Sequence, residues 1–193
     1  DHDERGVAAA LARRRRLGEQ RRASRLLGAG AEPLEEAAEH EQRGRDAVRF
    51  FLISRKADSE FVFDVDLALA RTDENPVFYV QMAHARIHGI TRRAAEAGFE
   101  RVPFADVDRS LLVHERELDV LRSLSELPDV VLSACTDRAP HRVTTWVREL
   151  ANDFHGFYHD CYVVGDGVSP ELTQARLWLV ESARIGLSIG LDL

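Results

Sequence analysis

The sequence predicts an all-α protein, a bundle of amphipathic helices, and three observations lead to this prediction. Apolar residues recur at intervals of three and four through most of the chain after residue 74, which is the period of a helix packed on one face. A capping residue followed by proline opens two of these segments, at Asn75-Pro76 and Ser169-Pro170. The 193 residues are 45% hydrophobic, which is enough for the core of one ordinary domain with an appendage.

Residues 1–43 differ in composition from the rest of the chain. Arginines cluster at 13–16 and again at 21–25, a Gly-rich break follows at 28–31, and an acidic stretch comes next. A basic arm for nucleic acid or targeting would fit this pattern, and so would a solvated, weakly ordered tail. Because the segment has few large core residues, we expect an atypical Arg-rich stretch without a stable fold.

Residues 44–73 are expected to hold two short helices joined by extended chain. The apolar run at 47–53 follows a start signal at Asp46, which favours helix over strand. Residues 61–66 alternate apolar and acidic side chains, as extended backbone does, so Asp64 or Asp66 can cap a helix at 67–71. The two aspartates could also bind a metal, but no third ligand motif accompanies them.

The longest helical signal begins at Asn75-Pro76 and continues past Gly89. At about 100° per residue, its apolar positions share one face, which consists of Val80, Ala83, Ile87, Ile90 and Ala94. A second stripe beside that face consists of Tyr79, Met82, Arg86 and Arg93. A ring, a flexible apolar side chain and planar cations on one face can stack on unpaired RNA bases and contact phosphates. Packing against a neighbouring helix is the alternative that spacing alone leaves open.

Three further long helices are expected between residue 108 and the end of the sequence. The first opens at Asp108 or Ser110 and is expected to stop at Pro128, with another helical segment following it. Pro140 begins the next helix, and Ser169 caps the last one. The chain after residue 74 therefore reads as four or five helices joined by short connections.

Motifs that carry chemistry are scarce in this sequence. It has no phosphate-binding glycine loop and no HExxH, paired CxxC or GxSxG motif. His155 and His159 are four residues apart, with Cys161 nearby, which is the spacing of a two-ligand metal site. A structural metal normally needs four ligands, so surface or capping histidines are the favoured interpretation. We expect neither a metal site nor a catalytic residue in this chain.

Charge and cysteine content restrict the classes of partner. The net charge of −7 provides no global basic field, so an RNA contact would depend on shape and a few local residues. The two cysteines, Cys135 and Cys161, show no disulfide framework, which fits a reducing cytoplasm. No apolar run reaches the roughly 20 residues that span a bilayer. We expect a cytoplasmic protein without a membrane partner.

Residues 75–86 read Asn-Pro-Val-Phe-Tyr-Val-Gln-Met-Ala-His-Ala-Arg. This stretch resembles the motif Asn-Pro-Val-Tyr-Tyr-Val-Gln-Tyr-Ala-His-Ala-Arg of the arginyl-tRNA synthetases, which are class I aminoacyl-tRNA synthetases. Segments 44–52 and 63–69 are similar to the end of that family's catalytic domain, and segments within 140–161 match later parts in the same order. The resemblance implies a catalytic-domain remnant at 44–73 and, at 74–193, a helical bundle of the class I synthetase anticodon-binding type.

The resemblance also implies a function and site residues. The family joins arginine to its tRNA with ATP, through an arginyl-adenylate, and its helical domain grips the anticodon stem-loop. The side chains that this family turns toward the anticodon loop correspond to Tyr79, Met82 and Arg86, with Tyr158 as a further candidate. Met82 stands where the family usually has tyrosine, so ring stacking is lost there, although methionine can still pack on a base.

The family's ATP signatures, of the His-Ile-Gly-His and Lys-Met-Ser-Lys types, occur nowhere in the sequence. We expect a fragment that binds arginine-accepting tRNA, holds no cofactor of its own and is inactive alone, ATP being used by the parent enzyme. A separate catalytic-domain fragment is a candidate partner. The alternative is a stand-alone helical interaction protein, derived from the synthetase, that does not bind RNA. The apolar side chains left exposed by the missing domain are expected to be Phe50, Phe51, Leu52, Phe61 and Phe63.

Overall fold

Helices make up the regular structure of the part of the chain that the computed structural model describes, residues 44–56 and 58–193. Four long helices follow residue 74: α4 (Pro76–Glu96), α5 (Glu115–Thr136), α6 (His141–Asp160) and α7 (Pro170–Asp192). A helix at 44–53 and α3 (Val65–Leu69) precede them, and two single turns, η1 (Phe104–Asp106) and η2 (Arg109–Leu111), connect α4 to α5. The all-α prediction is confirmed, while the prediction for residues 1–43 lies outside the described residues.

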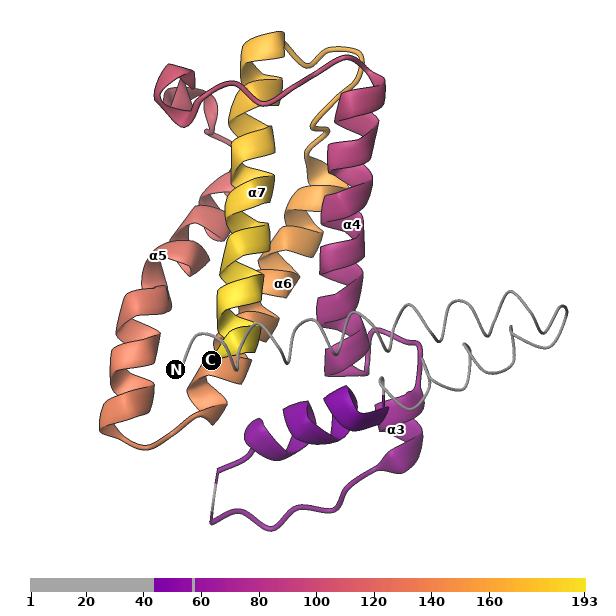
Figure 1. Ribbon diagram of the computed structural model, residues 1–193, viewed down its shortest axis with the longest axis vertical. Helices are drawn as coiled ribbons and strands as arrows, with labels where there is room; N and C mark the ends of the chain where they lie inside the picture. The colour runs from indigo at the N-terminus through magenta and orange to yellow at the C-terminus, as the bar shows by residue number, and fades with distance from the viewer. Residues whose placement is uncertain (1–43, 57) are drawn as a thin grey trace, which may run out of the picture. The chain divides into compact units, whose positions relative to one another are not determined.

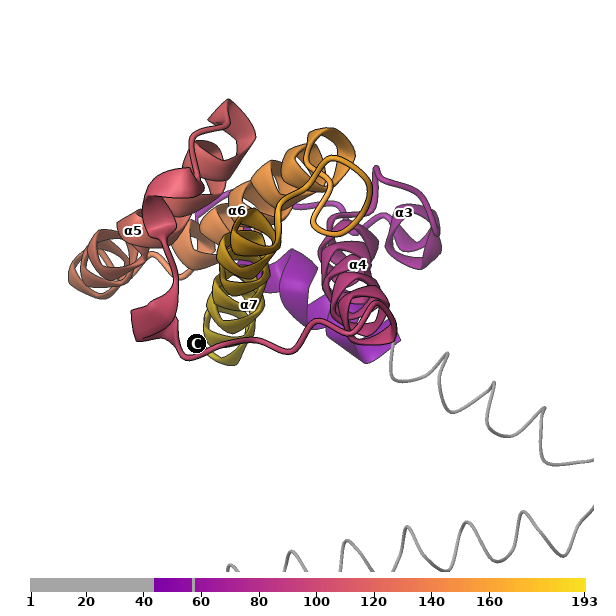
Figure 2. The same ribbon diagram turned by 90° about the horizontal axis from the view of Figure 1, so that it is seen from above.

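The four long helices run alternately up and down, with α6 and α7 in the middle, α4 on one side and α5 on the other (Figures 1 and 2). Helix α6 contributes the three largest fully buried side chains among the described residues, which are Trp146, Phe154 and Phe157. Residues 46–193 form one compact unit around this core. Within the described residues, no helix combines the length and the apolar character that a membrane span requires.

Side-chain caps set the starts of several helices where the sequence predicts them. Asn75 accepts a hydrogen bond from the backbone N–H two residues later and so caps α4. Its amide group also donates to the carbonyl oxygens of Ala68 (3.0 Å) and Ala70 (2.9 Å), which ties α4 to the end of α3. Asp64 caps α3 and Ser169 caps α7. The caps predicted at Asn75 and Ser169 are confirmed. Of the two candidates Asp64 and Asp66, Asp64 is the cap, and α3 begins at Val65 and not at the predicted residue 67.

Helix α5 differs from its prediction at its start and in its course. It begins at Glu115, where the side chain of His114 caps it, and not at Asp108 or Ser110. Asp108 caps the short η2 turn instead. Pro128 lies inside α5 and does not end it. The apolar side of α5 packs on α6 and α7, and this packing outweighs the backbone hydrogen bond that a proline removes.

The predicted exposed apolar patch is wrong for two of its members. Phe50 and Phe51 are 9% and 6% exposed and belong to the core of this chain, because the helix at 44–53 packs against the bundle. Phe61 and Phe63 are half-buried, and the ring centroids of Phe51 and Phe63 are 5.8 Å apart. Leu52 is 57% exposed, as predicted.

Candidate nucleic-acid interface

Helix α4 presents the predicted stripe along the line where it meets α6. The adjacent side of α4 faces the core, and its buried residues are Val77, Val80, Ala83, Ile87, Ile90 and Ala94. Tyr79, Met82 and Arg86 are half-buried, whereas Arg93 is exposed. The stripe therefore borders the core, and its polar ends remain near the surface of the bundle.

His155 on α6 joins two residues of this stripe. Arg86 donates from Nη1 to Nδ1 of His155 at 2.6 Å, and Nε2 of His155 lies 3.0 Å from the carbonyl oxygen of Tyr79. A guanidinium only donates and a carbonyl only accepts, so Nε2 must carry the proton and donate it, and the ring is neutral. The His155 ring also meets the Tyr79 ring edge-on, with centroids 4.3 Å apart.

Burial lowers the pKa of His155 below its ordinary value, and the positive charge of Arg86 acts in the same direction. The carbonyl of Tyr79 and the carboxylate of Asp73 oppose this shift without cancelling it. Only 8% of His155 is exposed. The direction of the pKa shift and the hydrogen-bond geometry thus agree on a neutral imidazole.

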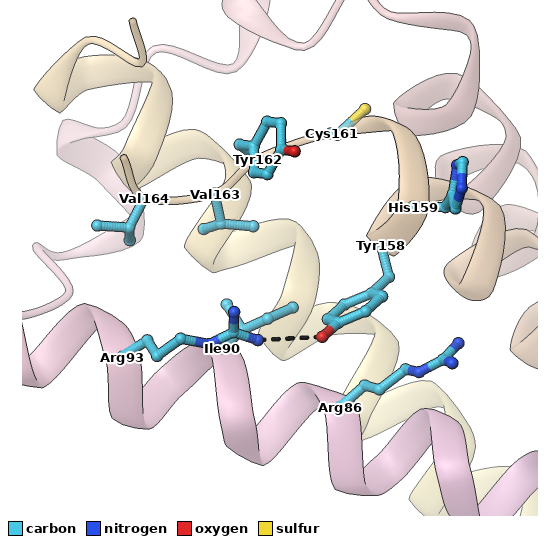
Figure 3. A pocket seen from close by; sticks show the side chains of 9 residues that line it. All are labelled: Arg86, Ile90, Arg93, Tyr158, His159, Cys161, Tyr162, Val163 and Val164. Atoms are coloured by element: carbon cyan, nitrogen blue, oxygen red, sulfur yellow. Dashed lines mark hydrogen bonds between the residues drawn. The ribbon is translucent and has the colours of Figure 1, made fainter. Parts of the chain in front are cut away.

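Tyr158, one turn after His155 on α6, lies between two arginines of α4. The Cζ atom of Arg86 is 4.9 Å from the centre of the Tyr158 ring, and that of Arg93 is 5.9 Å from it. Arg93 also donates from Nη2 to the Tyr158 hydroxyl at 3.1 Å (Figure 3). These cation–π contacts hold both guanidinium groups beside an aromatic ring.

Neither Arg86 nor Arg93 is part of an ion pair among the described residues. No carboxylate in the described part of the chain forms an ion pair with Arg86 or Arg93. Arg176 on α7, by contrast, is held 2.6 Å from the carboxylate of Glu117. Two guanidinium groups without an ion pair thus lie on the α4–α6 face, while the carboxylates of Asp73 and Asp153 act on the neighbouring Tyr79 without contacting either arginine.

A cavity of about 410 Å³ adjoins Tyr158 at the end of α6. Its walls come from α4, from the last turn of α6 and from the segment at 161–164 (Figure 3). The lining residues are Arg86, Ile90, Arg93, Tyr158, His159, Cys161, Tyr162, Val163 and Val164. Apolar walls with two cations at one side can take an unpaired base and its phosphate.

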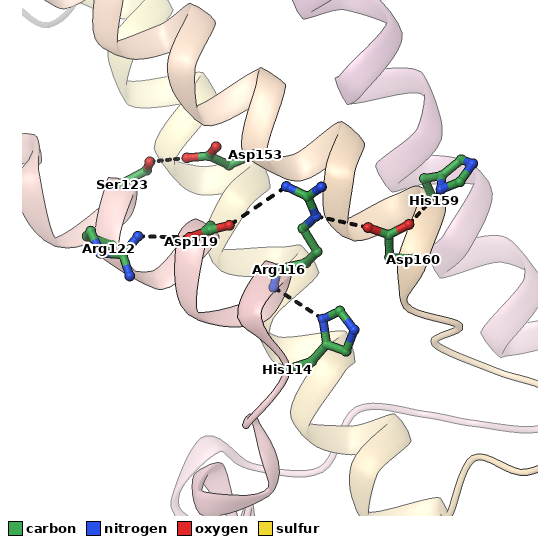
Figure 4. A network of polar contacts seen from close by, with 8 residues as sticks. All are labelled: His114, Arg116, Asp119, Arg122, Ser123, Asp153, His159 and Asp160. Atoms are coloured by element: carbon green, nitrogen blue, oxygen red, sulfur yellow. Dashed lines mark hydrogen bonds and ion pairs between the residues drawn. The ribbon is translucent and has the colours of Figure 1, made fainter.

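The arginines of the neighbouring α5–α6 face are paired with carboxylates, as Figure 4 shows. Asp160 accepts from Nε of Arg116 at 2.9 Å and from Nδ1 of His159 at 2.6 Å, and these hydrogen bonds, that of His159 first, lower its pKa. Asp119 pairs with Arg122 at 2.8 Å and lies 3.9 Å from Arg116. The arginines of this face therefore offer less free positive charge than Arg86 and Arg93 do.

Three of the four predicted site residues come together in one cluster, which contains Tyr79, Arg86 and Tyr158 around His155. Met82 is half-buried on the same face of α4, and neither Met82 nor Tyr79 lines the cavity. The Tyr79 hydroxyl donates to the Asn152 side chain at 3.2 Å, which fixes the ring at the α4–α6 junction.

The sequence did not predict that His155 joins Tyr79 to Arg86 or that Tyr162 lines the cavity. From the sequence, His155 is a candidate metal ligand or capping residue, although its position three residues before Tyr158 on a helix indicates a shared face. Tyr162 follows the end of α6, where no helical period applies. Among the described residues, no three His, Cys, Asp or Glu side chains lie together as metal ligands would.

Comparison with known proteins adds independent information. The family described as the DALR anticodon binding domain matches residues 80–193. The chain is 50% identical to an arginine–tRNA ligase of Polynucleobacter necessarius over 150 residues, which are 78% of this chain and 25% of that protein. It is 52% identical to an arginine–tRNA ligase of Paraburkholderia phytofirmans over 138 residues, 68% of this chain and 23% of that one.

A solved structure shares the fold as well. The arginyl-tRNA synthetase of Thermus thermophilus superposes with a TM-score of 0.62 and 28% identity, covering 91% of this chain and 30% of the synthetase. The chain thus spans about a quarter of the length of the curated relatives that it matches.

Proposed function

We propose, from the premise that this chain belongs to the family of DALR anticodon-binding domains of arginine–tRNA ligases, that it binds the anticodon loop of arginine-accepting tRNA. One observation carries the proposal: Arg86 and Arg93 flank the ring of Tyr158 and have no carboxylate partner among the described residues. Rings beside unneutralised guanidinium groups are what a protein offers to splayed bases and their phosphates.

The contacts of each side chain suggest separate tasks in this complex. Tyr79 and Tyr158 supply rings for stacking, which contributes about 1–3 kcal/mol for each base. Arg86 supplies a phosphate or base contact beside them. Met82 packs on a neighbouring base without the geometry of a ring. The cavity beside Tyr158 receives one unpaired base.

The longer relatives suggest how the chain is used. We propose that it serves a ligase that attaches arginine to tRNA with ATP, that ATP acts outside this chain, and that the process is cytoplasmic. Residues 44–73 would then be the end of a catalytic domain and residues 74–193 the tRNA-binding domain. A separate catalytic-domain chain is the proposed protein partner. We expect no arginine-dependent ATP–pyrophosphate exchange from this chain alone, and such activity would contradict this assignment.

Fluorescence titration of a labelled arginine tRNA transcript tests the binding proposal. Cognate tRNA should bind more tightly than a non-cognate transcript, and affinity should fall as salt rises. Arg86→Ala and Tyr79→Ala should each weaken cognate binding about tenfold, as loss of a charge-assisted or stacking contact predicts. Arg122→Ala is the matched control, because Arg122 is paired with Asp119 on another face.

The outcomes of this titration separate the two candidate functions. If the chain binds neither transcript, it fits the alternative of a helical interaction protein without RNA affinity. If cognate tRNA binds but Arg86→Ala and Tyr79→Ala leave the dissociation constant unchanged, the tRNA site lies elsewhere on the chain.

A further inference from the structure

Arg86 is oriented by an unusual partner for an arginine in this protein. Several other arginines among the described residues are held by carboxylates, as Arg176 is by Glu117 and Arg116 by Asp160. The Nη1 group of Arg86 instead donates to the neutral ring of His155 at 2.6 Å. His155 is buried, so it is a fixed part of the bundle and not a mobile surface side chain.

The choice of acceptor decides how much charge the arginine can offer. A carboxylate at this distance would hold the guanidinium in place and cancel most of its positive charge. A neutral imidazole accepts the same hydrogen bond and adds no negative charge. Arg86 therefore keeps one defined orientation while no carboxylate is in contact with its guanidinium group, which can still pair with a phosphate.

The hydrogen bond of Nε2, the second ring nitrogen of His155, fixes which tautomer faces Arg86. Nε2 donates to the carbonyl oxygen of Tyr79 at 3.0 Å, so the backbone of α4 selects the tautomer that leaves Nδ1 free to accept from Arg86. The edge-on contact with the Tyr79 ring fixes the plane of the imidazole. The same side chain thus contacts both Tyr79 and Arg86.

We propose that His155 is a positioning residue for RNA, a buried neutral acceptor that orients Arg86 without neutralising it. This inference rests on the proposed function, because it assigns to His155 a role in the same tRNA site. His155 itself does not contact RNA. Its effect on affinity passes through the guanidinium of Arg86.

Three substitutions separate orientation from charge. His155→Ala removes the acceptor and should weaken binding of the arginine tRNA transcript about tenfold. His155→Asn places an amide oxygen near the position of Nδ1 and should restore affinity to within about threefold of the wild type. His155→Asp has the same shape but carries a negative charge, so affinity should be about tenfold lower than with asparagine.

A double-mutant cycle tests whether His155 acts through Arg86. Adding His155→Ala to Arg86→Ala should cause no further loss of affinity, because the side chain that His155 orients is already gone. Thermal unfolding followed by circular dichroism identifies the temperature at which all variants are folded, and the titrations are made there. Asparagine that binds no better than alanine, or equal losses from His155→Ala with and without the Arg86 side chain, would overturn the inference.

The same data distinguish this inference from the proposed function. If Arg86→Ala weakens tRNA binding while His155→Ala leaves it unchanged, only the role of His155 is wrong. If Arg86→Ala is itself without effect, or the wild-type chain does not bind the transcript, the proposed site or function fails first.

Discussion

At the scale of single residues, the protonation state of the buried His155 imidazole depends on its neighbours. The ring faces Arg86 and the Tyr79 carbonyl on α4, and the carboxylate of Asp73 also acts on it. Protonation of Nδ1 would place a donor against the guanidinium of Arg86 and break their hydrogen bond. The folded state therefore resists protonation of this ring more than the unfolded chain does.

The free energy of unfolding should decrease as the pH falls below about 6.5. Burial lowers the pKa of His155 in the folded state, so between that pKa and its ordinary value of 6.5 the unfolded chain binds a proton that the folded chain does not. Urea unfolding between about pH 7.5 and 5.5 measures the slope, which His155→Asn should reduce. An unchanged slope in this variant would contradict the neutral state of the ring.

His84 provides the matched control for this experiment. Burial, followed by the effects of His88 and Arg184, lowers the pKa of His84, so it contributes to the slope in the same direction. His84→Asn should remove only the contribution of His84 to the slope of the unfolding free energy against pH, and the contribution of His155 should remain.

At the scale of elements, the caps determine where helices begin, and Asn75 does more than cap. It is 4% exposed, accepts from the N–H of Val77 and donates to two carbonyl oxygens at the end of α3. A sequence can indicate the first of these bonds, because capping is local. The two bonds to α3 depend on the chain folding back on itself.

Asn75→Ala should lower the free energy of unfolding by about 2 kcal/mol, since it removes a cap and leaves two carbonyl groups without a donor. Ser169→Ala removes an exposed cap from α7 and should cost only about 1 kcal/mol. Urea unfolding of both variants gives the comparison. Equal losses would show that the bonds from Asn75 to α3 add nothing to stability.

At the scale of the whole molecule, a buried ion pair links parts of the bundle that are far apart in sequence. Glu117 on α5 accepts from Nε of Arg176 on α7 at 2.6 Å, and its other oxygen accepts from the backbone N–H of His114 at 2.8 Å. Arg176 also donates to the carbonyl oxygen of Tyr162, in the segment that lines the cavity beside α6. This pair therefore connects α5 and α7 with one wall of the candidate site.

Glu117→Gln should lower the free energy of unfolding by about 2–3 kcal/mol, because it keeps the volume but leaves Arg176, whose side chain is only 12% exposed, without a counter-charge. Arg122→Ala breaks an exposed ion pair with Asp119 and should cost less than about 1 kcal/mol. Chemical denaturation measures both. A loss for Glu117→Gln no larger than that control would show that the pair is not a structural link.

The sequence by itself determined the helical class, the caps at Asn75 and Ser169, and the apolar face of α4. These features depend on residues within a few positions of one another, so their period and chemistry can be read along the chain. The resemblance to arginyl-tRNA synthetases, carried by residues 75–86 above all, supplied the family that the comparisons confirm.

Only the tertiary structure decided which residues act together at the candidate site. His155 and Tyr158 meet the stripe of α4 from about 70 positions away, and α5 continues through Pro128 because other helices pack against it. The burial of Phe50 and Phe51 has the same origin. Contacts between distant segments determine the burial of Phe50 and Phe51, the tautomer of His155 and the absence of an ion pair at Arg86. No local sequence pattern contains these contacts.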